Sequence, residues 1–378
     1  MPPFQPQTPA ATPLTCLCGN EASARGALEA GIRLATGYPG TPATAALEYL
    51  LREASGSVRV EWAINEKVAL EVAAGHSWAG QRSYVAMKMS GLNVASDSLL
   101  SVATSGTRGG LVVYVGDDPG MYYGMVEQDS RLWGRMAALP VVEPGGVDEA
   151  RRLTRDAFEV SEAAETPVLV RGTTTTANTF GPVESGEIHS ERCASSVPFD
   201  LDRYTKAGAA RCLEQHRQTL ERLAEAGRLL DKHNRLDLRS GPLGVIASAS
   251  TWSYLEEVLG ELDPAERPST LRVVVMNPLP DERLCQLLGH CRRVLVIEEL
   301  EPLIEERCRA LASELAHAPT ILGKRDGLLS PVGDFSPEIV GKAWTALRGE
   351  DVRPPALVAE EPRHTPPWSG RLLTFCPG

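Results

Sequence analysis

Four segments of the sequence combine side chains that can do chemistry with glycines or prolines, and each lies at or after the end of a predicted strand. They are GYPGTPAT (Gly37–Thr44), EWAINEKVALEVAAG (Glu61–Gly75), MKMSGLNVASD (Met87–Asp97) and GDDPGMYYGMVEQDSR (Gly116–Arg131). Because open parallel sheets bind ligands beyond the carboxyl ends of their strands, we expect these segments to meet at one edge of a sheet. The chemistry they offer is proton transfer by a carboxylate and close approach of a flat ligand to glycine backbone.

The first two segments have structural explanations on pattern alone. Thr41 stands before Pro42 at a predicted helix start, where a threonine N-cap and a proline are both common. Asn65 can cap the next helix, and the helix dipole favours the carboxylate of Glu66 in its first turn. The small residues within Ala69–Gly75 would nevertheless admit another backbone or a ligand close to that helix.

The other two segments point more directly to binding. Gly91 ends a strand and would let a flat ring approach the backbone. The segment Gly116–Arg131 is predicted to be a long loop with paired carboxylates and two tyrosines, and such loops are usually functional. Adjacent carboxylates seldom converge on one metal ion, so we predict a hydrogen-bonding or solvated role for Asp117 and Asp118, and no metal site.

The elements that must position these residues indicate an α/β fold. From about Gly19 to Arg171, helical patterns alternate with short β-rich runs, which is typical of a doubly wound parallel sheet. The predicted strands are Ile32–Thr36, Val58–Trp62, Ser83–Lys88, Leu111–Gly116, Pro140–Val142 and Pro167–Arg171, with Glu21–Ala30 among the helices between them. The alternation resumes at Gly241 with predicted strands Leu243–Ala247, Leu271–Val275 and Val294–Ile297 and helices Trp252–Leu262, Asp281–Leu288, Leu303–Ala316 and Pro337–Arg348. A second, smaller α/β domain is therefore predicted.

Composition and periodicity predict the boundaries between these parts. We expect a mobile leader over residues 1–18, a first domain over 19–185 and a second domain over 241–350. Between the domains, the linker 186–240 should carry one helix over Arg211–His233 that lies on a domain surface. Residues 351–378 are predicted to be a Pro-rich, extended tail. The carboxylates Glu298, Glu299, Glu301, Glu305 and Glu306 are predicted to form a solvated helix start rather than a docking patch.

Composition also excludes several classes of function. The net charge of -11 offers no basic surface for nucleic acid, and no apolar run approaches the roughly 20 residues that span a bilayer. The eight cysteines contain no CxxC pair, so neither a metal site nor an iron–sulfur cluster is predicted. No phosphate-binding loop and no G-x-G-x-x-G motif follow a strand. We expect a cytoplasmic, ligand-binding α/β protein.

Taken together, the segments resemble the large subunits of indolepyruvate:ferredoxin oxidoreductases, within the thiamine-diphosphate-dependent 2-oxoacid:ferredoxin oxidoreductase superfamily. The motifs that carry the resemblance are GNEASARGALEAG (Gly19–Gly31), ATGYPGTPAT (Ala35–Thr44), VEWAINEKVALEVAAG (Val60–Gly75), GLNVASD (Gly91–Asp97), GDDPG (Gly116–Gly120) and EQDSR (Glu127–Arg131). They occur in the family's order and spacing. VIEELEPLIEE (Val296–Glu306) and the pair Gly323 and Lys324 resemble the family's second domain.

The resemblance implies a pyrimidine-binding first domain and a second domain similar to the C-terminal domain of transketolases. It also implies that Glu66 is the catalytic residue, hydrogen-bonded to N1′ of the aminopyrimidine ring. That bond promotes the imine form of the 4′-amino group, which removes the thiazolium C2 proton. The implied cofactor-binding residues are Tyr38, Pro39, Gly40, Thr41, Gly91, Leu92 and Asn93. The implied substrate-binding residues are Thr41, Asp118, Tyr122, Tyr123 and Gln128.

The resemblance further implies partners. Full-length family members continue into a diphosphate- and metal-binding domain that opens with a Cys-Pro-Gly-Cys-like sequence and then into a cysteine-rich domain, whereas this sequence ends LLTFCPG (Leu372–Gly378). We therefore expect thiamine diphosphate to be shared with a second polypeptide that holds Mg²⁺. A further small subunit is an additional candidate partner, and a 2-oxoacid is the expected substrate.

Two departures from the family pattern leave three hypotheses open. Met121–Met125 stand where the family has small polar residues and a histidine, which implies a more apolar and aromatic pocket. Thr173–Thr176 and Asn178 replace a Thr-Thr-Arg sequence and a following histidine. The chain could serve an oxidoreductase for an aryl- or alkyl-2-oxoacid, or a split decarboxylase or carboligase without ferredoxin chemistry. The third hypothesis is a non-catalytic assembly or regulatory paralogue.

Overall fold

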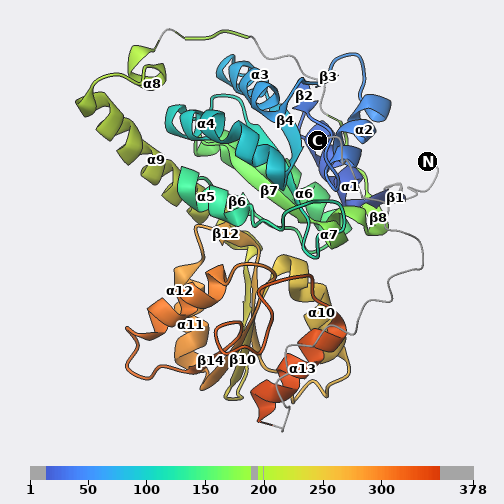
Figure 1. The fold of residues 1–378 in the computed structure, drawn as a ribbon, viewed down its shortest axis with the longest axis vertical. Helices are drawn as coiled ribbons and strands as arrows, with labels where there is room; N and C mark the ends of the chain where they lie inside the picture. The colour runs from blue at the N-terminus through green and yellow to red at the C-terminus, as the bar shows by residue number, and fades with distance from the viewer. Residues whose placement is uncertain (1–13, 189–194, 199, 350–378) are drawn as a thin grey trace, which may run out of the picture.

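The computed structural model describes residues 14–188, 195–198 and 200–349, which form two α/β domains stacked along the long axis of the molecule (Figure 1). The predicted α/β fold class is confirmed. Most of the predicted leader and the predicted tail lie outside the described residues. Within the described ranges, no helix combines the length and apolar character needed to cross a lipid bilayer.

The first domain is built on a seven-stranded sheet in the order β12-β6-β7-β5-β4-β2-β3. Its strands are β2 (Leu34–Gly37), β3 (Arg59–Trp62), β4 (Ser83–Lys88), β5 (Leu111–Asp117), β6 (Val141–Val142), β7 (Val168–Thr173) and β12 (Val275–Asn277). All pairings are parallel except that of β12 with β6. Strands β4, β5 and β7 are buried throughout, as expected when helices cover both faces of a parallel sheet.

Helices cover the two faces of this sheet. Helices α1 (Gly19–Glu29), α2 (Thr44–Glu53) and α6 (Val147–Ala163) share one apolar core, and α3 (Glu66–Trp78), α4 (Met89–Ser105) and α5 (Arg131–Ala137) contribute to the other. Alternation along β4 divides its side chains between the two cores, since Tyr84 lies in the first and Val85 in the second. The second core continues without a break into the second domain through Val273 and Met276.

Part of the predicted leader forms a strand. Residues Leu14–Cys18 form strand β1, which pairs antiparallel with β8 (Phe180–Glu184) just after the short helix α7 (Thr174–Asn178). The expectation of a leader up to residue 18 is therefore wrong for 14–18. The pairing joins segments 170 residues apart at Leu14 and Glu184, so the local composition of the leader could not indicate it.

The region between the domains contains the predicted surface helix. It is α9 (Ala209–Leu230), which continues into a 3-10 turn at Asp231–His233 and is preceded by the short helix α8 (Leu201–Tyr204). Helix α9 lies along the outside of the first domain, in contact with α4 and α6 (Figure 1). Its apolar side bears Ala226 and Leu230, both of which are buried.

The second domain has a five-stranded sheet in the order β14-β13-β10-β11-β9. Its strands are β9 (Arg235–Asp237), β10 (Leu243–Ser248), β11 (Ser269–Val273), β13 (Arg293–Ile297) and β14 (Thr320–Leu322), and its helices are α10 (Ala249–Gly260), α11 (Asp281–His290), α12 (Leu303–Ala312) and α13 (Pro337–Arg348). Only β9 runs antiparallel to its neighbour.

The predicted strand Leu271–Val275 is in fact two strands in two different sheets. Strand β11 ends at Val273, and β12 begins at Val275 and joins the sheet of the first domain. The Asn234 side chain explains the break, because its Oδ1 accepts hydrogen bonds from the backbone N–H groups of Val274 (2.8 Å) and Val275 (3.1 Å). A side-chain amide thus satisfies the backbone where the chain passes from one sheet to the other.

Two buried arginines form ion pairs at the domain boundary, and one of them, Arg131, bonds to both domains. Arg171 at the end of β7 donates to Asp117 (2.6 Å) and to Glu143. Arg131 at the start of α5 donates to Asp129 (2.6 Å) and, in the second domain, to Glu298 (2.8 Å). These six side chains are all buried, so each charge needs its partner. We call Asp117, Asp129, Arg131, Glu143, Arg171 and Glu298 the ionic seam.

The predicted solvated helix start is wrong for three of its five carboxylates. Glu298, Glu299 and Glu305 are buried, whereas Glu301 and Glu306 are exposed. Glu298 accepts from the backbone N–H groups of Ile304 (3.1 Å) and Glu305 (2.9 Å) in the first turn of α12, and Glu299 accepts from the N–H of Phe335 (2.9 Å). The buried carboxylates are tolerated because backbone donors and the ionic seam satisfy them.

Close packing of α1 against α6 predicts opposite effects for two helical glycines. A Cβ at Gly26 would overlap the carbonyl oxygen of Arg151, whereas a Cβ at the exposed Gly75 of α3 would meet nothing within 4 Å. Gly26→Ala should lower the free energy of unfolding by about 3 kcal/mol through overpacking. Gly75→Ala should raise it by about 0.5–1 kcal/mol through helix propensity. Urea unfolding of both variants measures the contrast, and equal effects would contradict this description of the α1–α6 contact.

Burial of Glu299 predicts a pH-dependent contribution to stability. Burial raises the pKa of Glu299 to about 7 from an ordinary value of 4.5, and the Phe335 N–H and Arg171 oppose the shift only in part. The other titratable groups that act on it are Glu143, Asp334, Lys324 and Tyr254. A carboxyl whose pKa is higher in the folded protein stabilises the fold below its unfolded pKa and loses that contribution as the pH rises through its folded pKa.

Relative to Glu299→Gln, the wild-type protein should therefore lose up to about 3 kcal/mol of stability between pH 4.5 and pH 8. Urea unfolding at several pH values measures this difference. Glu301→Gln, at an exposed glutamate two residues further along, is the matched control. A wild-type-minus-variant difference that does not change with pH would refute the assignment.

Candidate functional site

The carboxyl end of β4 is the point where the predicted segments meet. A Cβ at Gly40, in the turn after β2, would lie 2.8 Å from Lys88 Cβ, and one at Gly124 would lie 3.1 Å from Lys88 Nζ. A Cβ at Gly91 would lie 2.5 Å from Glu66 Cγ. Four segments that are far apart in sequence are thus in direct contact around Lys88–Gly91, as expected for the edge of a parallel sheet.

Glu66 is a buried carboxyl at the start of a helix. It is the first residue of α3, whose N-cap Asn65 accepts from the Val68 N–H (2.9 Å). The Glu66 side chain is 5% exposed, and within the described part of the chain it has no hydrogen bond or ion pair with another side chain. Burial raises the pKa of the Glu66 carboxyl, and its own backbone N–H lowers it in part. The group is therefore suited to hold or give a proton to a ligand.

Gly91 packs directly against that carboxyl, which occupies the space that a side chain at this position would need. Because the alanine methyl would fall 2.6 Å from Glu66 Oε1, only glycine keeps both groups in place. The neighbouring Leu92 side chain is fully buried in the core, so this residue can offer a ligand only its backbone. The arrangement is a flat surface of backbone with one carboxyl at its edge.

The turn Tyr38–Thr41 borders the same region. The Gly40 N–H donates to Thr44 Oγ1 (2.8 Å), and the buried Asn20 side chain donates to the carbonyl of Pro42 (2.8 Å). Tyr38, Pro39 and Thr41 are half-buried. Asn20 and Thr44 thus hold the backbone of the turn, and its side chains keep part of their surface accessible to a ligand.

Asn93 and Gln128, predicted separately for cofactor and substrate, lie together. Asn93 Nδ2 donates to Gln128 Oε1 (2.9 Å), and Trp133 Nε1 donates to Asn93 Oδ1 (3.2 Å). All three side chains are at least partly accessible. They connect the first turn of α4 to the end of the long loop after β5.

Asp118 organises that loop. Its buried carboxylate accepts from the backbone N–H groups of Tyr122 (3.2 Å) and Tyr123 (2.7 Å) and from Thr174 Oγ1 (2.7 Å). The rings of Tyr122 and Tyr123 are exposed. The structure therefore directs the carboxylate of Asp118 towards the loop backbone and leaves the tyrosine rings outside.

Sequence reasoning missed Lys88. This residue is buried, its Nζ donates to the carbonyl of Tyr123 (2.8 Å), and it lies 3.6 Å from Asp118 Oδ2. It fixes the loop to the end of β4 at the centre of the candidate site. The signal was present in the sequence, since a lysine ends the otherwise apolar run YVAM.

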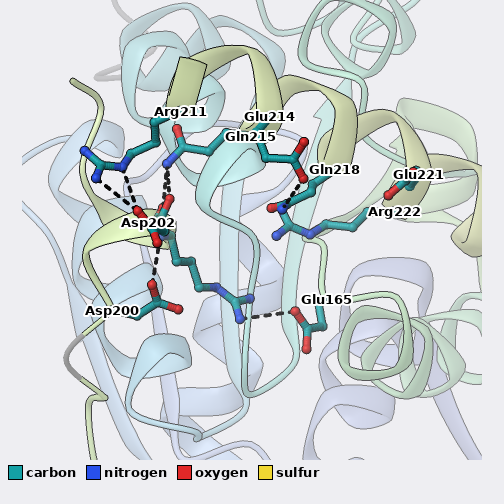
Figure 2. Close-up of a pocket in the computed structure, with 10 residues that line it drawn as sticks. Glu165, Asp200, Asp202, Arg211, Glu214, Gln215, Gln218, Glu221 and Arg222 are labelled. Carbon is teal, nitrogen blue, oxygen red and sulfur yellow. Dashed lines mark hydrogen bonds and ion pairs between the residues drawn. The ribbon is translucent and has the colours of Figure 1, made fainter. Parts of the chain in front are cut away.

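A separate cavity of about 700 Å³ lies between α8, α9 and the first domain, away from all of these residues (Figure 2). Its lining mixes both charges, including Arg203, Arg222, Asp202 and Glu165. Arg203 and Arg222 donate there to backbone carbonyls at Ser105, Thr107 and Thr104, where α4 ends. Cations are favourable at a helix C-terminus, so these arginines have a structural role.

Metal ligation was not predicted for this chain. Across residues 14–188, 195–198 and 200–349, no three or more His, Cys, Asp or Glu side chains are grouped so that they could hold a metal ion. The prediction that a partner holds Mg²⁺ is not tested by this observation.

The fold resembles solved structures of related enzymes. The 2-oxoglutarate:ferredoxin oxidoreductase from Magnetococcus marinus superimposes with a TM-score of 0.71 at 17% identity, over 91% of this chain and 66% of that one. A split-gene transketolase, described as an inactive β4 tetramer, superimposes with a TM-score of 0.55 at 13% identity, over 89% of this chain and 99% of that one. At these identities the likeness concerns the fold alone.

Sequence comparison is more specific. The indolepyruvate oxidoreductase subunit IorA of Methanothermobacter marburgensis is 35% identical over 371 residues, which is 96% of this chain and 58% of that protein. IorA of Pyrococcus abyssi is 36% identical over 82% of this chain and 49% of that protein. The 2-oxoglutarate synthase subunit KorA of Methanothermobacter thermautotrophicus is 30% identical over 41% of this chain and 43% of that protein. The chain thus spans about half the length of these two IorA relatives.

A family model agrees with these relatives. Residues 25–207 match the thiamine diphosphate-binding domain of pyruvate flavodoxin/ferredoxin oxidoreductases. The matched range contains Glu66, Gly91 and the loop after β5. The chain is therefore a homologue of the indolepyruvate oxidoreductase subunit IorA whose first domain is a thiamine diphosphate-binding domain of the pyruvate flavodoxin/ferredoxin oxidoreductase type.

Proposed function

We propose that this chain supplies the pyrimidine-binding half of the thiamine diphosphate site in a 2-oxoacid oxidoreductase, and that Glu66 controls the proton on N1′ of the cofactor. The observation that carries the proposal is the buried Glu66 carboxyl, which has no side-chain partner among the described residues and packs directly against Gly91. Because glycine has no side chain, a flat ring could approach the backbone there. The raised pKa of Glu66 favours a protonated carboxyl, which is what a ring nitrogen requires as its donor.

When bound, thiamine diphosphate would stabilise the negative charge left on the substrate carbon after a 2-oxoacid loses CO₂. The residues of this chain would prepare that chemistry. Glu66 would share its proton with N1′, the backbone at Gly91 and Leu92 would support one face of the ring, and the turn Tyr38–Thr41 would border the reacting end. Thr41 and Gln128 would offer hydrogen bonds to a carboxylate substrate.

The exposed loop supports a substrate with an apolar side chain. Tyr122, Tyr123 and Met125 are all exposed on the segment that covers Lys88. Aromatic rings and a methionine contact aryl or alkyl groups favourably. The relatives' name, indolepyruvate oxidoreductase, agrees with an aryl-2-oxoacid.

A second polypeptide would complete the site. Val72 on α3, Val94 on α4, and Leu132 and Met136 on α5 are exposed, and α4 contacts both of the other helices. An apolar face next to Glu66 and Gly91 suits a domain that brings the diphosphate and Mg²⁺ sites. The relatives are subunits by name, and a further small subunit and the electron acceptor would belong to the same assembly.

A decarboxylase or carboligase without ferredoxin chemistry is the second candidate. The observation that favours it is the loop Met121–Met125, which lacks any ionisable group other than its tyrosines. In this case a proton or an aldehyde would receive the acyl carbanion. Reduction of an acceptor dye by the reconstituted complex separates the two candidates, since only the oxidoreductase would reduce it.

Glu66→Gln tests the role of the carboxyl in the complex of this chain with its partner polypeptide. The amide keeps the size of the side chain but cannot transfer a proton, so the rate of 2-oxoacid decarboxylation should fall about 10²–10⁴-fold. Glu48→Gln, at an exposed carboxylate of α2, is the control and should leave the rate unchanged. A Glu66→Gln complex that retains nearly full activity would refute the assignment. If no combination of chains binds the cofactor, the non-catalytic hypothesis would stand.

Gly91→Ala tests the proposed binding surface. The methyl group would displace the Glu66 carboxyl from its position beside Gly91, so the dissociation constant for thiamine diphosphate should rise at least about tenfold. Calorimetric titration of the complex measures this, and a thermal melt checks that the variant is folded. Gly75→Ala, on the neighbouring helix, should bind as the wild type does. Unchanged affinity in Gly91→Ala would mean that the ring lies elsewhere.

A further inference from the structure

The loop that follows β5 is held from two sides. From its own domain, Asp118 and Lys88 bind the backbone of Tyr122 and Tyr123. From the second domain, the segment Ser330–Phe335 reaches its outer side. The loop between Gly120 and Glu127 is therefore shared by the two domains.

One carboxylate and one tyrosine make the contact with the second domain. Glu127 Oε1 accepts from the Gly120 N–H (2.7 Å) within the loop and from the Gly333 N–H (3.0 Å) of the second domain. The Tyr122 hydroxyl donates to Asp334 Oδ2 (2.9 Å). We call these three hydrogen bonds the clasp. Because carboxylates are the acceptors, each bond is of the stronger, charge-assisted kind.

The second-domain side of the clasp lies next to a buried residue. Phe335, next to Asp334, is buried in the core of the second domain, and its N–H is held by the buried Glu299. The ammonium group of Lys324 lies 5.4 Å from the centre of the Phe335 ring. The clasp therefore ties the loop to a segment that is anchored in the core of the second domain at Phe335.

Apart from the bonds of Asp118 and Lys88 to its backbone, the loop has little packing of its own. Its side chains from Met121 to Tyr123 and at Met125 and Val126 are exposed, so no apolar core holds them. Met121 has a φ of 54°, in the left-handed region that a non-glycine residue occupies at a cost. Such a conformation persists only where its surroundings impose it. The hydrogen bond from the Gly120 N–H to Glu127 holds the backbone at the residue just before Met121.

We infer that the second domain positions the loop Met121–Val126 over the candidate site, with Glu127 and Asp334 as the positioning residues. The consequence for substrate rests on the proposed function: the clasp would set where the rings of Tyr122 and Tyr123 stand relative to Lys88 and Gly91. Neither positioning residue touches the proposed reacting atoms. Loss of the clasp should therefore weaken substrate binding more than it slows the chemical step.

Simple packing between the domains is the alternative explanation, and it predicts something different. The domains are already joined by the ionic seam, by β12 and by a continuous apolar core. Glu127 and Asp334 are only half-buried and lie outside that core. If the clasp served only to hold the domains together, its loss would loosen the whole molecule and not the loop in particular.

Hydrogen–deuterium exchange resolved to single amides tests the inference without cofactor, substrate or activity. The variants are Glu127→Ala and Asp334→Ala, with Glu127→Gln and Asp334→Asn as conservative partners that keep an acceptor oxygen. Glu261→Ala, at an exposed residue at the end of α10, is the control. The reporters are the amides of Tyr122 and Tyr123, because they donate to Asp118 and not to either altered side chain.

Exchange at Tyr122 and Tyr123 should rise about tenfold in each alanine variant and less than about threefold in the conservative variants. The amides of Val113 and Val115 in β5 should exchange as in the wild type. Unchanged exchange at the two tyrosines would overturn the inference, and so would a rise of equal size in β5. Because none of this needs an active complex, failure of the proposed function would leave the exchange result intact.

In the reconstituted complex, the same alanine variants should raise KM for the 2-oxoacid about tenfold and change kcat less than about threefold. The double variant Tyr122→Phe with Asp334→Ala should raise KM no more than Asp334→Ala alone, since both remove the same bond. A fall in kcat at constant KM, or additive effects in the double variant, would overturn the positioning role of Asp334.

Discussion

The ion pairs of two buried arginines are the constraint on which the arrangement of the molecule depends. Arg171 and Arg131 together form ion pairs with four buried carboxyl groups, and three of these lie at or just after the ends of β5 and β6 or at the entry to α5. An uncompensated charge in this position would be costly, so the second domain cannot move away from the ends of β5, β6 and β7 without exposing or orphaning Glu298 and its partner. The second domain therefore covers the half of the carboxyl edge of the first sheet that is formed by β5, β6 and β7.

The other half of that edge stays open as a result. Strands β2, β3 and β4 end beyond the reach of the ionic seam, and there the turn at Gly40, the carboxyl of Glu66 and the backbone of Gly91 come together. The same sheet edge is thus divided between a structural function and a binding function. The loop after β5 crosses from one half to the other, because it begins at the seam residue Asp117 and ends at the seam residue Asp129. A shift of the ionic seam at the domain boundary would therefore move this loop at the candidate site.

Much of the first domain could be predicted from the sequence, and the reasons are local. Buried parallel strands are short apolar runs between helical patterns, so strands β2 to β7 of the first sheet were predicted to within two residues at each end. The ends of those strands then indicated where Glu66, Gly91 and the long loop would meet. What local patterns could not indicate were pairings between distant segments. Strand β1 pairs with the distant strand β8. The predicted single strand Leu271–Val275 is interrupted by hydrogen bonds to Asn234, about 40 positions earlier in the chain.

The buried carboxylates show the same limit for the site. In the run EELEPLIEE, local sequence does not distinguish buried from exposed glutamates, and contacts with other segments decide their burial. Arg131 binds Glu298, the Phe335 N–H donates to Glu299, and the Lys324 N–H donates to Glu305. The role of Lys88 could not be predicted because a single lysine at the end of an apolar strand does not indicate its partner, and Asp118 follows 30 residues later in the chain. The roles of Glu66 and Gly91 came from resemblance, and the structure adds the contact that makes the pair chemically sensible.

Strand β12 has a consequence for how the chain is made. It contributes the outermost strand of the first sheet, yet it follows β11 of the second domain in the chain. A ribosome therefore releases the whole first domain up to β8 while the edge of β6 still lacks its neighbour. Unpaired edges invite association with other chains. The edge of β6 can be paired only after residue 277 has been made, so completion of the first sheet depends on the segment between β11 and α11.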